Sequence, residues 1–346
     1  MGKTEASRLL DRRQMLALSA LGAAGAACGT TAPGATGDSS MITAATYIPP
    51  SYKDLYPAFP IFMDAAKKAK SGLKFDWHHS EKLLTADQLL SGLKQGVADL
   101  IFQLSSLISA TYPVLGATEL PFVNSTFTEQ KNALAVDGEL HALLNEELGK
   151  KGLMILGHMP TSFEWIWTVD KPVRTPDDLK GLRIRTAGDV EGATVKAYGA
   201  SPVAMSSAEV YQALQRGTVD GMIAYMGTVI GRSLQDVIKY GTIAPFGDYS
   251  IDAVVTTEWF DKQPKATQDA LTEAGKVYTE QGTAKMRKVH LDSYLPKIEQ
   301  AGVELYEPKG AELEVFRKAA MPVHDTWRGW VGNEALADKA LDLVSG

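Results

Sequence analysis

The 346-residue chain is 45% hydrophobic and 22% charged, and its formal net charge at pH 7 is -6. This composition excludes disordered, collagen-like and coiled-coil proteins. The acidic balance argues against a nucleic-acid-binding protein, because nucleic acids attract basic surfaces. Chains of about 300 residues tend to split into domains rather than enlarge one core, so we expect two well-packed domains.

The N-terminus has the pattern of an export signal. Arg12 and Arg13 precede an uncharged run, residues 15–27, which is too short and too rich in alanine and glycine to span a membrane. The arginine pair resembles a twin-arginine signal. We therefore expect residues 1–27 to be a signal peptide that directs the protein to the periplasm or to the outer face of the cytoplasmic membrane.

Cys28 is the only cysteine in the sequence, so it cannot form an internal disulfide. The sequence Gly-Ala-Ala-Cys that ends at Cys28 resembles the processing site of bacterial lipoproteins, in which the cysteine is lipidated. We expect lipidation of Cys28; the alternative is a chance cysteine in an alanine-rich signal. Residues 28–41 are rich in glycine, threonine, alanine and serine, which indicates a flexible tether.

Short apolar runs with β-branched or aromatic residues alternate with helical patterns along the rest of the chain, as in α/β domains. The predicted strands are 42–47, 73–78, 100–103, 153–158, 163–169, 182–185, 221–225 and 251–256. Thr85 with Gln88 and Ser206 with Glu209 form capping boxes, which indicate helix starts. Residues 264–300 are mostly helical in pattern, and a helix of this length could cross from one domain to the other.

Common catalytic and phosphate-binding motifs are absent from the sequence. It contains no G-x-S-x-G, G-x-x-x-x-G-K-[ST], G-x-G-x-x-G or H-E-x-x-H. The six histidines lack the spacing of metal ligands on a helix, and the adjacent pair His78 and His79 points to opposite faces of a predicted strand. We therefore expect no catalytic site, no metal site and no cofactor.

The segment 171–185, KPVRTPDDLKGLRIR, is the strongest signal in the sequence. It continues in order through YGASP at 198–202, SSAEVYQALQ at 206–215 and TVDG at 218–221. These runs resemble the substrate-binding proteins of TRAP transporters, the DctP-type family, and the resemblance extends from residue 42 to the C-terminus.

This resemblance implies a two-domain α/β fold of the periplasmic-binding-protein type, with a ligand cleft at the domain interface and a long helix that spans both domains. Domain I would comprise residues 42–162 plus 251–290, and domain II residues 163–250 plus 291–346. The protein would capture an organic acid, close around it and dock on the small and large membrane subunits of a permease. We expect a monomer that binds no nucleic acid.

Arg183 and Arg185 lie on one face of a predicted strand, because side chains alternate across a strand. A guanidinium can hold a carboxylate with two parallel hydrogen bonds, which lysine cannot. The alternative is that both arginines pair on a solvated face with Asp177, Asp178 or Asp189. The resemblance implies that Arg185 grips the ligand carboxylate, whereas Arg183 keeps the surface interpretation.

Three further positions match the family's ligand pocket: Glu164, Ser207 and Ala224 stand where the family has an arginine, a phenylalanine and an asparagine. A negative charge at Glu164 would repel a second carboxylate of the ligand. The resemblance with these departures therefore favours a monocarboxylate. The alternative is that Glu164 faces away from the cleft and pairs with Arg174 or another surface cation.

Aromatic residues near these positions suit a ligand with an apolar or aromatic body. Trp165 and Trp167 share one face of a predicted strand, and Tyr225 directly follows Ala224. The alternative for the tryptophans is ordinary core packing. In the first domain, we expect ligand contacts from residues at strand ends, since α/β sheets bind ligands at the carboxyl ends of their strands. These candidates are Tyr47, Gln103 and Ser105.

Two other functions remain open from the sequence. The same binding protein could report its ligand to a sensory system rather than feed a permease. A secreted hydrolase on a similar two-domain frame is the third possibility, although none of the common catalytic motifs supports it. The resemblance favours the transport function.

Overall fold

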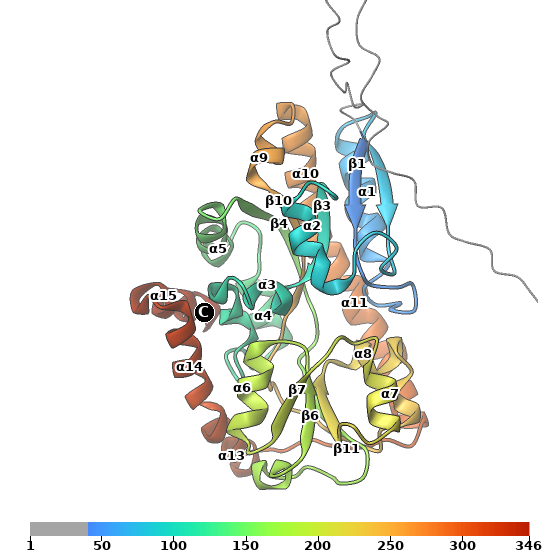
Figure 1. Cartoon of the computed structure of the whole chain (residues 1–346), viewed down its shortest axis with the longest axis vertical. Coiled ribbons are helices and arrows are strands. Elements are labelled where there is room, and N and C mark those ends of the chain that lie inside the picture. The colour runs from blue at the N-terminus through green and yellow to red at the C-terminus, as the bar shows by residue number, and fades with distance from the viewer. Residues whose placement is uncertain (1–40, 346) are drawn as a thin grey trace, which may run out of the picture. The chain divides into compact units, whose positions relative to one another are not determined.

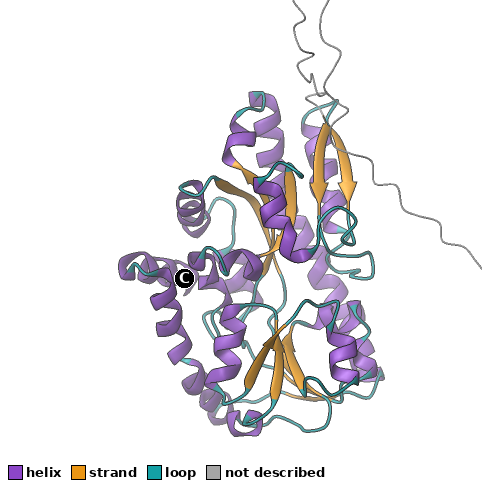
Figure 2. Ribbon diagram, viewed as in Figure 1, coloured by secondary structure: helices purple, strands orange, loops and turns teal. Residues whose placement is uncertain are grey.

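The computed structural model describes residues 41–345, which build two mixed β-sheets with helices packed around both (Figures 1 and 2). The first sheet has the order β2-β1-β3-β10-β4. Its strands are β1 (Met41–Ala45), β2 (Lys74–His78), β3 (Leu100–Leu104), β4 (Leu153–Pro160) and β10 (Ser250–Thr256). Strand β1 is parallel to β2 and β3, whereas β10 runs antiparallel between β3 and β4.

The second sheet has the order β11-β9-β5-β8-β6-β7. Its strands are β5 (Trp165–Thr168), β6 (Arg183–Thr186), β7 (Ser201–Ala204), β8 (Gly221–Ala224), β9 (Tyr240–Thr242) and β11 (Glu304–Tyr306). Strand β6 is parallel to β7 and β8, and β5 is antiparallel to β8 and β9. All eight predicted strands are present. The sequence analysis missed the short strands β7, β9 and β11, which lack a run of apolar residues.

Helices connect and cover the strands. The first ten α-helices are α1 (Ala58–Ala69), α2 (Leu89–Lys94), α3 (Ser105–Ser109), α4 (Phe127–Ala133), α5 (Glu139–Gly149), α6 (Asp189–Ala197), α7 (Val210–Gln215), α8 (Met226–Gly231), α9 (Thr257–Asp261) and α10 (Lys265–Val277). The others are α11 (Thr283–Val289), α12 (Leu295–Gln300), α13 (Ala311–Ala320), α14 (Pro322–Val331) and α15 (Glu334–Ser345). Four 3-10 helices complete the connections: η1 (Ala86–Gln88), η2 (Pro113–Glu119), η3 (Pro176–Leu179) and η4 (Leu234–Asp236).

The predicted long helix is confirmed. Helices α10, α11 and α12 follow one another through two π-helical segments, η5 (Tyr278–Gly282) and η6 (His290–Tyr294). Tyr278 and Met286 belong to the hydrophobic core of the first sheet, whereas Tyr294 and Ile298 belong to that of the second. One helical element therefore packs on both sheets.

A pair of glycines lets this helix approach the first sheet closely. Gly275 of α10 lies against Leu156 of β4, and a β-carbon at position 275 would overlap the Leu156 carbonyl group. A β-carbon at Gly157 would in turn meet the carbonyl oxygen of Gly275 at 2.5 Å. Any side chain at either position would push the helix away from the strand.

The C-terminal helix packs beside the first sheet rather than the second. Leu341 and Val344 of α15 belong to the same hydrophobic cluster as Leu140 and Leu143 of α5. The contacts of α15 are with α14, η2, α4 and α5. The predicted domain boundaries place residues 291–346, which include α15, in domain II. In the structure α15 packs against elements that were expected in domain I, and the boundaries themselves stay a prediction.

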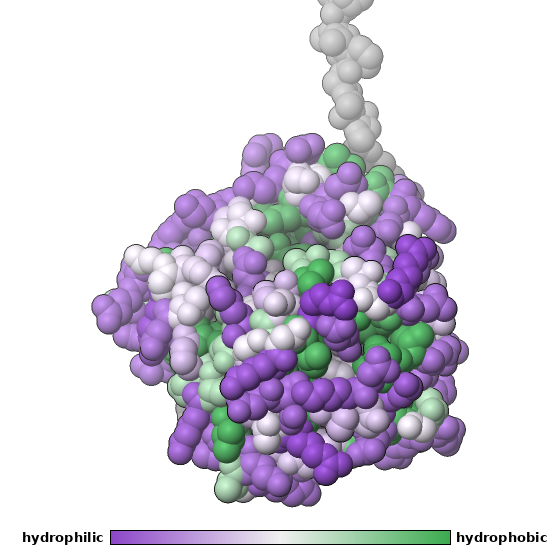
Figure 3. Space-filling view, turned by 60° about the horizontal axis from the view of Figure 1, so that its bottom comes forward, coloured by the Kyte–Doolittle hydropathy of each residue, from purple (hydrophilic) through white to green (hydrophobic). Residues whose placement is uncertain are grey.

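None of the helices within residues 41–345 has both the length and the apolar character needed to cross a membrane. Figure 3 shows one face of this part of the chain, on which hydrophilic side chains predominate and hydrophobic side chains form smaller groups between them. The predicted signal peptide and Cys28 lie outside the described residues.

Candidate functional site

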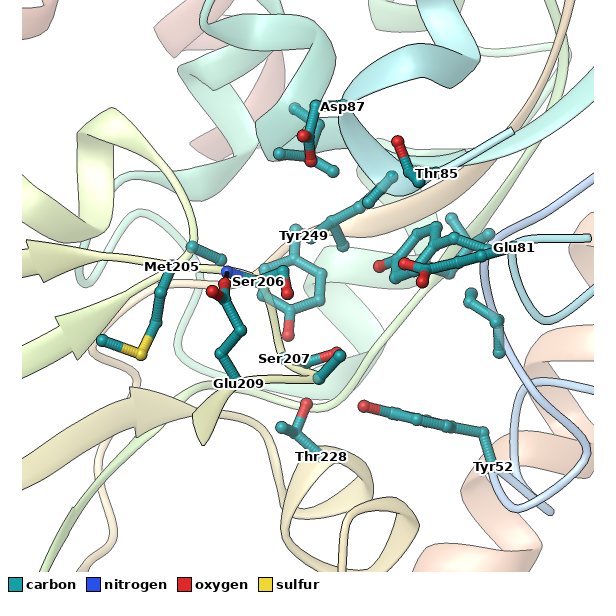
Figure 4. Close-up of a pocket in the computed structure, with 18 of the residues that line it drawn as sticks. Tyr52, Glu81, Thr85, Asp87, Met205, Ser206, Ser207, Glu209, Thr228 and Tyr249 are labelled. Carbon is teal, nitrogen blue, oxygen red and sulfur yellow. Dashed lines mark hydrogen bonds between the residues drawn. The ribbon is translucent and has the colours of Figure 1, made fainter. Parts of the chain in front are cut away.

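A cavity of about 660 Å³ lies between the two sheets. Tyr249 and Ile251 of its lining lie at the start of β10, and the rest comes from segments that follow β1, β2 and β3 of the first sheet and from segments at the ends of β6, β7 and β8 of the second. These are the carboxyl ends of parallel strands, where α/β sheets bind ligands. Figure 4 shows Glu81 and Thr85 on one side of the cavity and Ser206 and Glu209 on the opposite side, with Tyr249 between them.

Arg185 supplies a buried positive charge to this cavity. It lies in β6, in register with Val203 of β7 and Met222 of β8, and only 3% of its surface is exposed. Its Nε donates a hydrogen bond to the Met205 carbonyl oxygen at 3.1 Å. Among the residues that the structure describes, no acceptor binds its two terminal nitrogens and no carboxylate lies within 4.0 Å of the guanidinium. Two N–H groups on each terminal nitrogen are therefore available to a ligand.

Glu119, Glu164 and Glu191 form a buried group near Arg185, which we call the carboxyl cluster. Burial raises the pKa of Glu164 well above its usual value, and the nearby charge of Glu191 raises it further. Burial also raises the pKa of Glu119. The carboxyl group of Glu191 also lies within hydrogen-bonding reach of Glu164, which further favours the protonated form of Glu164.

Glu191 has partners that stabilise its ionised form. It accepts a hydrogen bond from the Ala187 backbone N–H at 2.5 Å and a second from the Gly188 backbone. Burial raises its pKa, but the charge of Arg185 and these backbone donors oppose the rise. Burial and the charge of Glu191 thus favour the uncharged form of Glu164, which would weaken the repulsion that the sequence analysis expected from it.

Four tyrosines, rather than tryptophans, line the cavity: Tyr47, Tyr52, Tyr225 and Tyr249. The rings of Tyr225 and Tyr249 meet edge to face, with centroids 5.7 Å apart. Burial raises the pKa of both phenols well above the usual value, so both are uncharged. They can offer ring faces and O–H groups to the body of a ligand.

Trp165 and Trp167 share a face of β5 as predicted, but they pack in the core of the second sheet. Their ring centroids are 5.5 Å apart, and Trp167 Nε1 donates a hydrogen bond to the Ala224 carbonyl oxygen at 2.8 Å. Neither tryptophan lines the cavity. The core-packing alternative therefore describes their position.

Arg232 is a second arginine close to the cavity wall. Its Nε and Nη2 donate hydrogen bonds to Ser207 Oγ at 3.3 and 3.1 Å. The same Nε donates to the Tyr52 hydroxyl at 3.3 Å, and the guanidinium carbon lies 5.3 Å from the centroid of the Tyr52 ring. Ser207 and Tyr52 line the cavity, so Arg232 acts on it through two hydroxyl groups.

The structure brings four of the predicted site residues to the cavity, and their binding of a ligand stays a prediction. They are Tyr47, Arg185, Ser207 and Tyr225. The predicted residues that do not line it are Glu164, Trp165, Ala224, Gln103 and Ser105.

Gln103 and Ser105 have structural hydrogen bonds instead. Gln103 Nε2 donates to the Ala86 carbonyl oxygen at 2.8 Å, and Ser105 Oγ accepts from the Ser250 backbone N–H at 3.2 Å. Both side chains are buried. The prediction located the correct strand end, but the cavity is lined there by Leu104 and Leu107.

Several polar lining residues were missed by the sequence analysis. They are Tyr52, Glu81, Thr85, Asp87, Glu209, Thr228 and Tyr249. Thr85 and Glu209 belong to the predicted capping boxes, so a helix start at a strand's carboxyl end was an available signal. Glu81 had none, because its position depends on a left-handed backbone at Ser80 (φ 58°) and Glu81 (φ 60°).

Arg183 lies on the surface, as the sequence analysis inferred, but with a different partner. It pairs with Asp220, with an Nη2 to Oδ1 distance of 2.6 Å, and not with Asp177, Asp178 or Asp189. Arg174 likewise pairs with Glu304 at 3.1 Å rather than with Glu164. Within residues 41–345, no group of three or more histidine, cysteine, aspartate or glutamate side chains could hold a metal ion.

Comparison with protein families identifies one match along most of the chain. The DctP family model, described as bacterial extracellular solute-binding protein, family 7, matches residues 55–329. The C4-dicarboxylate-binding protein DctB of Bacillus subtilis is 27% identical over 280 residues, which are 80% of this chain and 79% of that protein. The C4-dicarboxylate-binding periplasmic protein DctP of Rhodobacter capsulatus is 29% identical over 58% of this chain and 60% of that protein.

Solved structures share the fold. A TRAP periplasmic solute-binding protein from Ralstonia eutropha with bound (S)-2-acetolactate has a TM-score of 0.80 at 24% identity, over 88% of this chain and 99% of that chain. DctP7 of Bordetella pertussis, a receptor that binds pyroglutamic acid, has a TM-score of 0.79 at 22% identity, with the same coverage of both chains. These likenesses confirm the predicted two-domain α/β fold.

Proposed function

Because the chain belongs to the DctP family, bacterial extracellular solute-binding protein family 7, we propose that it captures one organic acid for a TRAP-type membrane permease. The family consists of solute-binding proteins outside the cytoplasm, and the proposed function includes no catalytic step. The ligand would be a monocarboxylate with an apolar or aromatic body, held through Arg185. Lipid anchoring through Cys28 and a monomeric state are parts of the same proposal.

The observation that carries this proposal is the unpaired guanidinium of Arg185 in the wall of a cavity between two sheets. The charge of Glu191 lowers the cost of burying this cation, but Glu191 does not pair with it, so an anionic ligand can supply the partner that its terminal nitrogens lack. A carboxylate is the best complement, since its two oxygens match the planar fork of donors.

The remaining lining supports a single carboxylate on the ligand. Glu81, Asp87 and Glu209 are exposed carboxylates that line the cavity, and we call them the rim carboxylates. They would repel a second negative charge, which is the role the sequence analysis gave to Glu164. The tyrosine rings complement an apolar body. Acetolactate and pyroglutamate, bound by the two solved relatives, are both monocarboxylates.

Closure of the cleft follows from the division of the lining between the sheets. Tyr47 and Tyr52 come from the first sheet's side, whereas Arg185 and Ser207 come from the second. A ligand that contacts both sides binds the closed form more tightly and so shifts the equilibrium toward it. The long helix through η5 and η6, which packs on both cores, would have to accommodate this motion.

A ligand screen by thermal shift tests the proposal. Aliphatic monocarboxylates, aryl acids and dicarboxylates are compared, and a ligand at 100 times its Kd should stabilise the fold by about 2.7 kcal/mol. Arg185→Ala should abolish the shift, and Arg185→Lys should lose most of it because lysine cannot make the paired hydrogen bonds.

Arg183→Ala is the matched control on the same strand, since Arg183 pairs with Asp220 on the surface. It should keep the ligand-induced shift. Circular dichroism of each ligand-free variant verifies that it is folded. Unchanged affinity in Arg185→Ala, or dicarboxylates that bind more tightly than all monocarboxylates, would contradict the proposal.

A further inference from the structure

Three hydroxyl groups lie together in the wall of the cavity. Figure 4 shows the hydroxyls of Tyr52, Ser207 and Thr228 converging on one region of the wall. All three residues line the cavity. Within the described part of the chain, none of these hydroxyls donates a hydrogen bond to a protein acceptor. Their partners must therefore come from water or from a ligand.

Arg232 fixes the direction of two of these hydroxyls. A guanidinium is donor-only and cannot be deprotonated in a protein, so Ser207 and Tyr52 must accept from it. Ser207 Oγ accepts from two N–H groups, at 3.3 and 3.1 Å, which occupies both of its lone pairs. The Tyr52 oxygen accepts a third hydrogen bond at 3.3 Å. Ser207 therefore has only its O–H left and can only donate, and the Tyr52 O–H is also free to donate.

We propose that Ser207 and Tyr52, oriented by Arg232, form a subsite for a neutral acceptor oxygen of the ligand, such as the carbonyl oxygen of an oxo acid. This inference rests on the proposed binding of an organic acid at Arg185. Ser207 and Tyr52 are the specificity-determining residues of the subsite. Arg232 is a positioning residue that acts through their hydroxyls.

The charges around the subsite decide between kinds of ligand group. In the described chain no carboxylate lies within 4.0 Å of Arg232, so its charge makes both hydroxyls stronger donors. The N–H donors of an ammonium group would face the O–H donors of Ser207 and Tyr52, and its charge would be repelled by Arg232. A second carboxylate would meet the rim carboxylates Glu81, Asp87 and Glu209. A neutral acceptor oxygen avoids both penalties.

The subsite residues Ser207 and Tyr52 and the carboxylate anchor Arg185 line the same cavity of about 660 Å³, so one ligand could contact all three. Burial raises the pKa of the Tyr47 phenol, and the charges of Arg232 and Arg185 both oppose that rise. Both guanidiniums therefore act on the same cavity-lining side chain. A small oxo acid could place its carboxylate at Arg185 and its oxo group at Ser207 and Tyr52.

Matched pairs of acids test the inference by isothermal titration calorimetry. Butanoate is compared with 2-oxobutanoate, 3-oxobutanoate and 2-aminobutanoate, and pentanoate is compared with 4-oxopentanoate and the dicarboxylate glutarate. At least one oxo acid should bind about tenfold more tightly than its parent acid, because two charge-assisted donors gain an acceptor. The amino acid and the dicarboxylate should show no such gain.

Substitutions then locate the gain. Ser207→Ala and Tyr52→Phe should each lower the affinity for the oxo acid about threefold or more beyond any change in the affinity for the parent acid. Arg232→Gln should remove most of the advantage, and Arg232→Lys should keep part of it, since lysine retains the charge without the paired donors. Ser206→Ala is the control, because Ser206 lines the cavity without a bond to Arg232.

The inference is overturned when no oxo acid binds more tightly than its parent, or when these variants weaken both ligands equally. A greater gain for the amino acid or the dicarboxylate overturns it as well. The two failures are distinguishable: if Arg185→Ala leaves the binding of all these acids unchanged, the proposed function itself fails. If binding depends on Arg185 but shows no oxo-acid advantage, only the subsite fails.

Discussion

The carboxyl cluster beside Arg185 and a second buried polar group, in the first sheet, use their hydrogen-bonding atoms in different ways. The second group runs through Asn145, His141, His158, Asp252 and Ser250, and we call it the histidine chain. Its ring nitrogens bond in sequence: Asn145 Nδ2 to His141 Nε2 at 2.9 Å, His141 Nδ1 to His158 Nε2 at 3.0 Å, and His158 Nδ1 to Asp252 Oδ1 at 2.9 Å. All four ring nitrogens have a partner.

The orientation of Asn145 determines every proton in the histidine chain. Asn145 Oδ1 accepts from the Ile155 backbone N–H at 2.8 Å, so its Nδ2 donates to His141. His141 must then carry its proton on Nδ1 and donate it to His158, and His158 must donate its own to Asp252. Both rings are therefore neutral. A buried network that is satisfied in this way rigidifies the fold.

The carboxyl cluster, in contrast, leaves atoms unsatisfied. One oxygen of each member, Glu119, Glu164 and Glu191, is buried without a hydrogen-bond partner among the described residues. Such atoms are rare in folded proteins, and they gather where function outweighs stability. The comparison teaches that burial alone does not distinguish a structural cluster from a functional one. The unsatisfied cluster is the one next to the proposed ligand anchor.

The largest expected effect comes from breaking the histidine chain. His158→Phe keeps a ring of similar shape but leaves the Asp252 carboxylate without its imidazole partner and the His141 N–H without an acceptor. Leaving a buried carboxylate and a buried N–H without their hydrogen-bond partners costs the desolvation of both groups, together about 3 kcal/mol or more. Urea denaturation at pH 7 should show that loss in the free energy of unfolding.

Glu164→Gln at pH 6 is the control from the other cluster. It exchanges a neutral carboxyl for a neutral amide of the same shape, so it should change the free energy of unfolding by less than about 1 kcal/mol. Equal losses in the two variants would show that the clusters do not differ as described.

The next prediction concerns the carboxyl cluster and rising pH. The pKa of Glu164 is raised in the folded state by burial, so above the unfolded value of about 4.3 the folded state binds the extra proton. Stability is therefore lost as pH rises from about 4.3 through the raised folded pKa. The Glu164→Gln variant cannot titrate at this position. From pH 5 to pH 8 its free energy of unfolding should therefore rise by on the order of 1 to 2 kcal/mol relative to that of the wild type.

Chemical denaturation at several pH values measures this difference. Glu146→Gln is the control, because Glu146 is exposed on α5 and pairs only with Lys150. Its stability relative to the wild type should stay nearly constant over the same range. A flat difference for Glu164→Gln would mean that Glu164 is ionised in the folded protein at neutral pH.

The contrast between Arg185 and Glu164 shows how far the sequence could predict the site. The family resemblance predicted that Arg185 grips the ligand, and the structure has Arg185 in the wall of the cavity, while its binding of a ligand stays a prediction. Glu164 was read as a charge facing the ligand, but its ionisation depends on its distance from Glu191, which is 27 positions away in the chain. No local pattern encodes that pairing or the burial of both groups.

The fold was more predictable because its signals are local. Apolar runs predicted eight strands and the long helix, whereas the three-residue strands β9 and β11 are held by pairing rather than by their own sequence. The hydroxyl subsite was unpredictable for a similar reason. Ser207 was predicted, but its link to Tyr52 runs through Arg232, which lies 180 positions from Tyr52.

The smallest expected effect is the loss of folding stability that His141 of the histidine chain causes as the pH falls. Burial, with a further contribution from His158, lowers the pKa of His141 to about 3, compared with about 6.5 in the unfolded chain. Below pH 6.5 the unfolded state therefore binds a proton that the folded state excludes, and stability is lost as pH falls. The two clusters should thus have pH dependences of opposite sign.

His141→Asn removes this titration. The broken bond to His158 lowers the free energy of unfolding of this variant by the same amount at every pH. Between pH 6.5 and pH 5.5, however, its free energy of unfolding should rise by about 1 kcal/mol relative to that of the wild type. His78→Asn is the surface control, since His78 is partly exposed and pairs with Asp76 at 2.9 Å. An acid dependence unchanged in His141→Asn would mean that His141 is protonated in the folded protein. The Asn145-directed proton order of the histidine chain would then be wrong, because His141 would need an acceptor at both ring nitrogens.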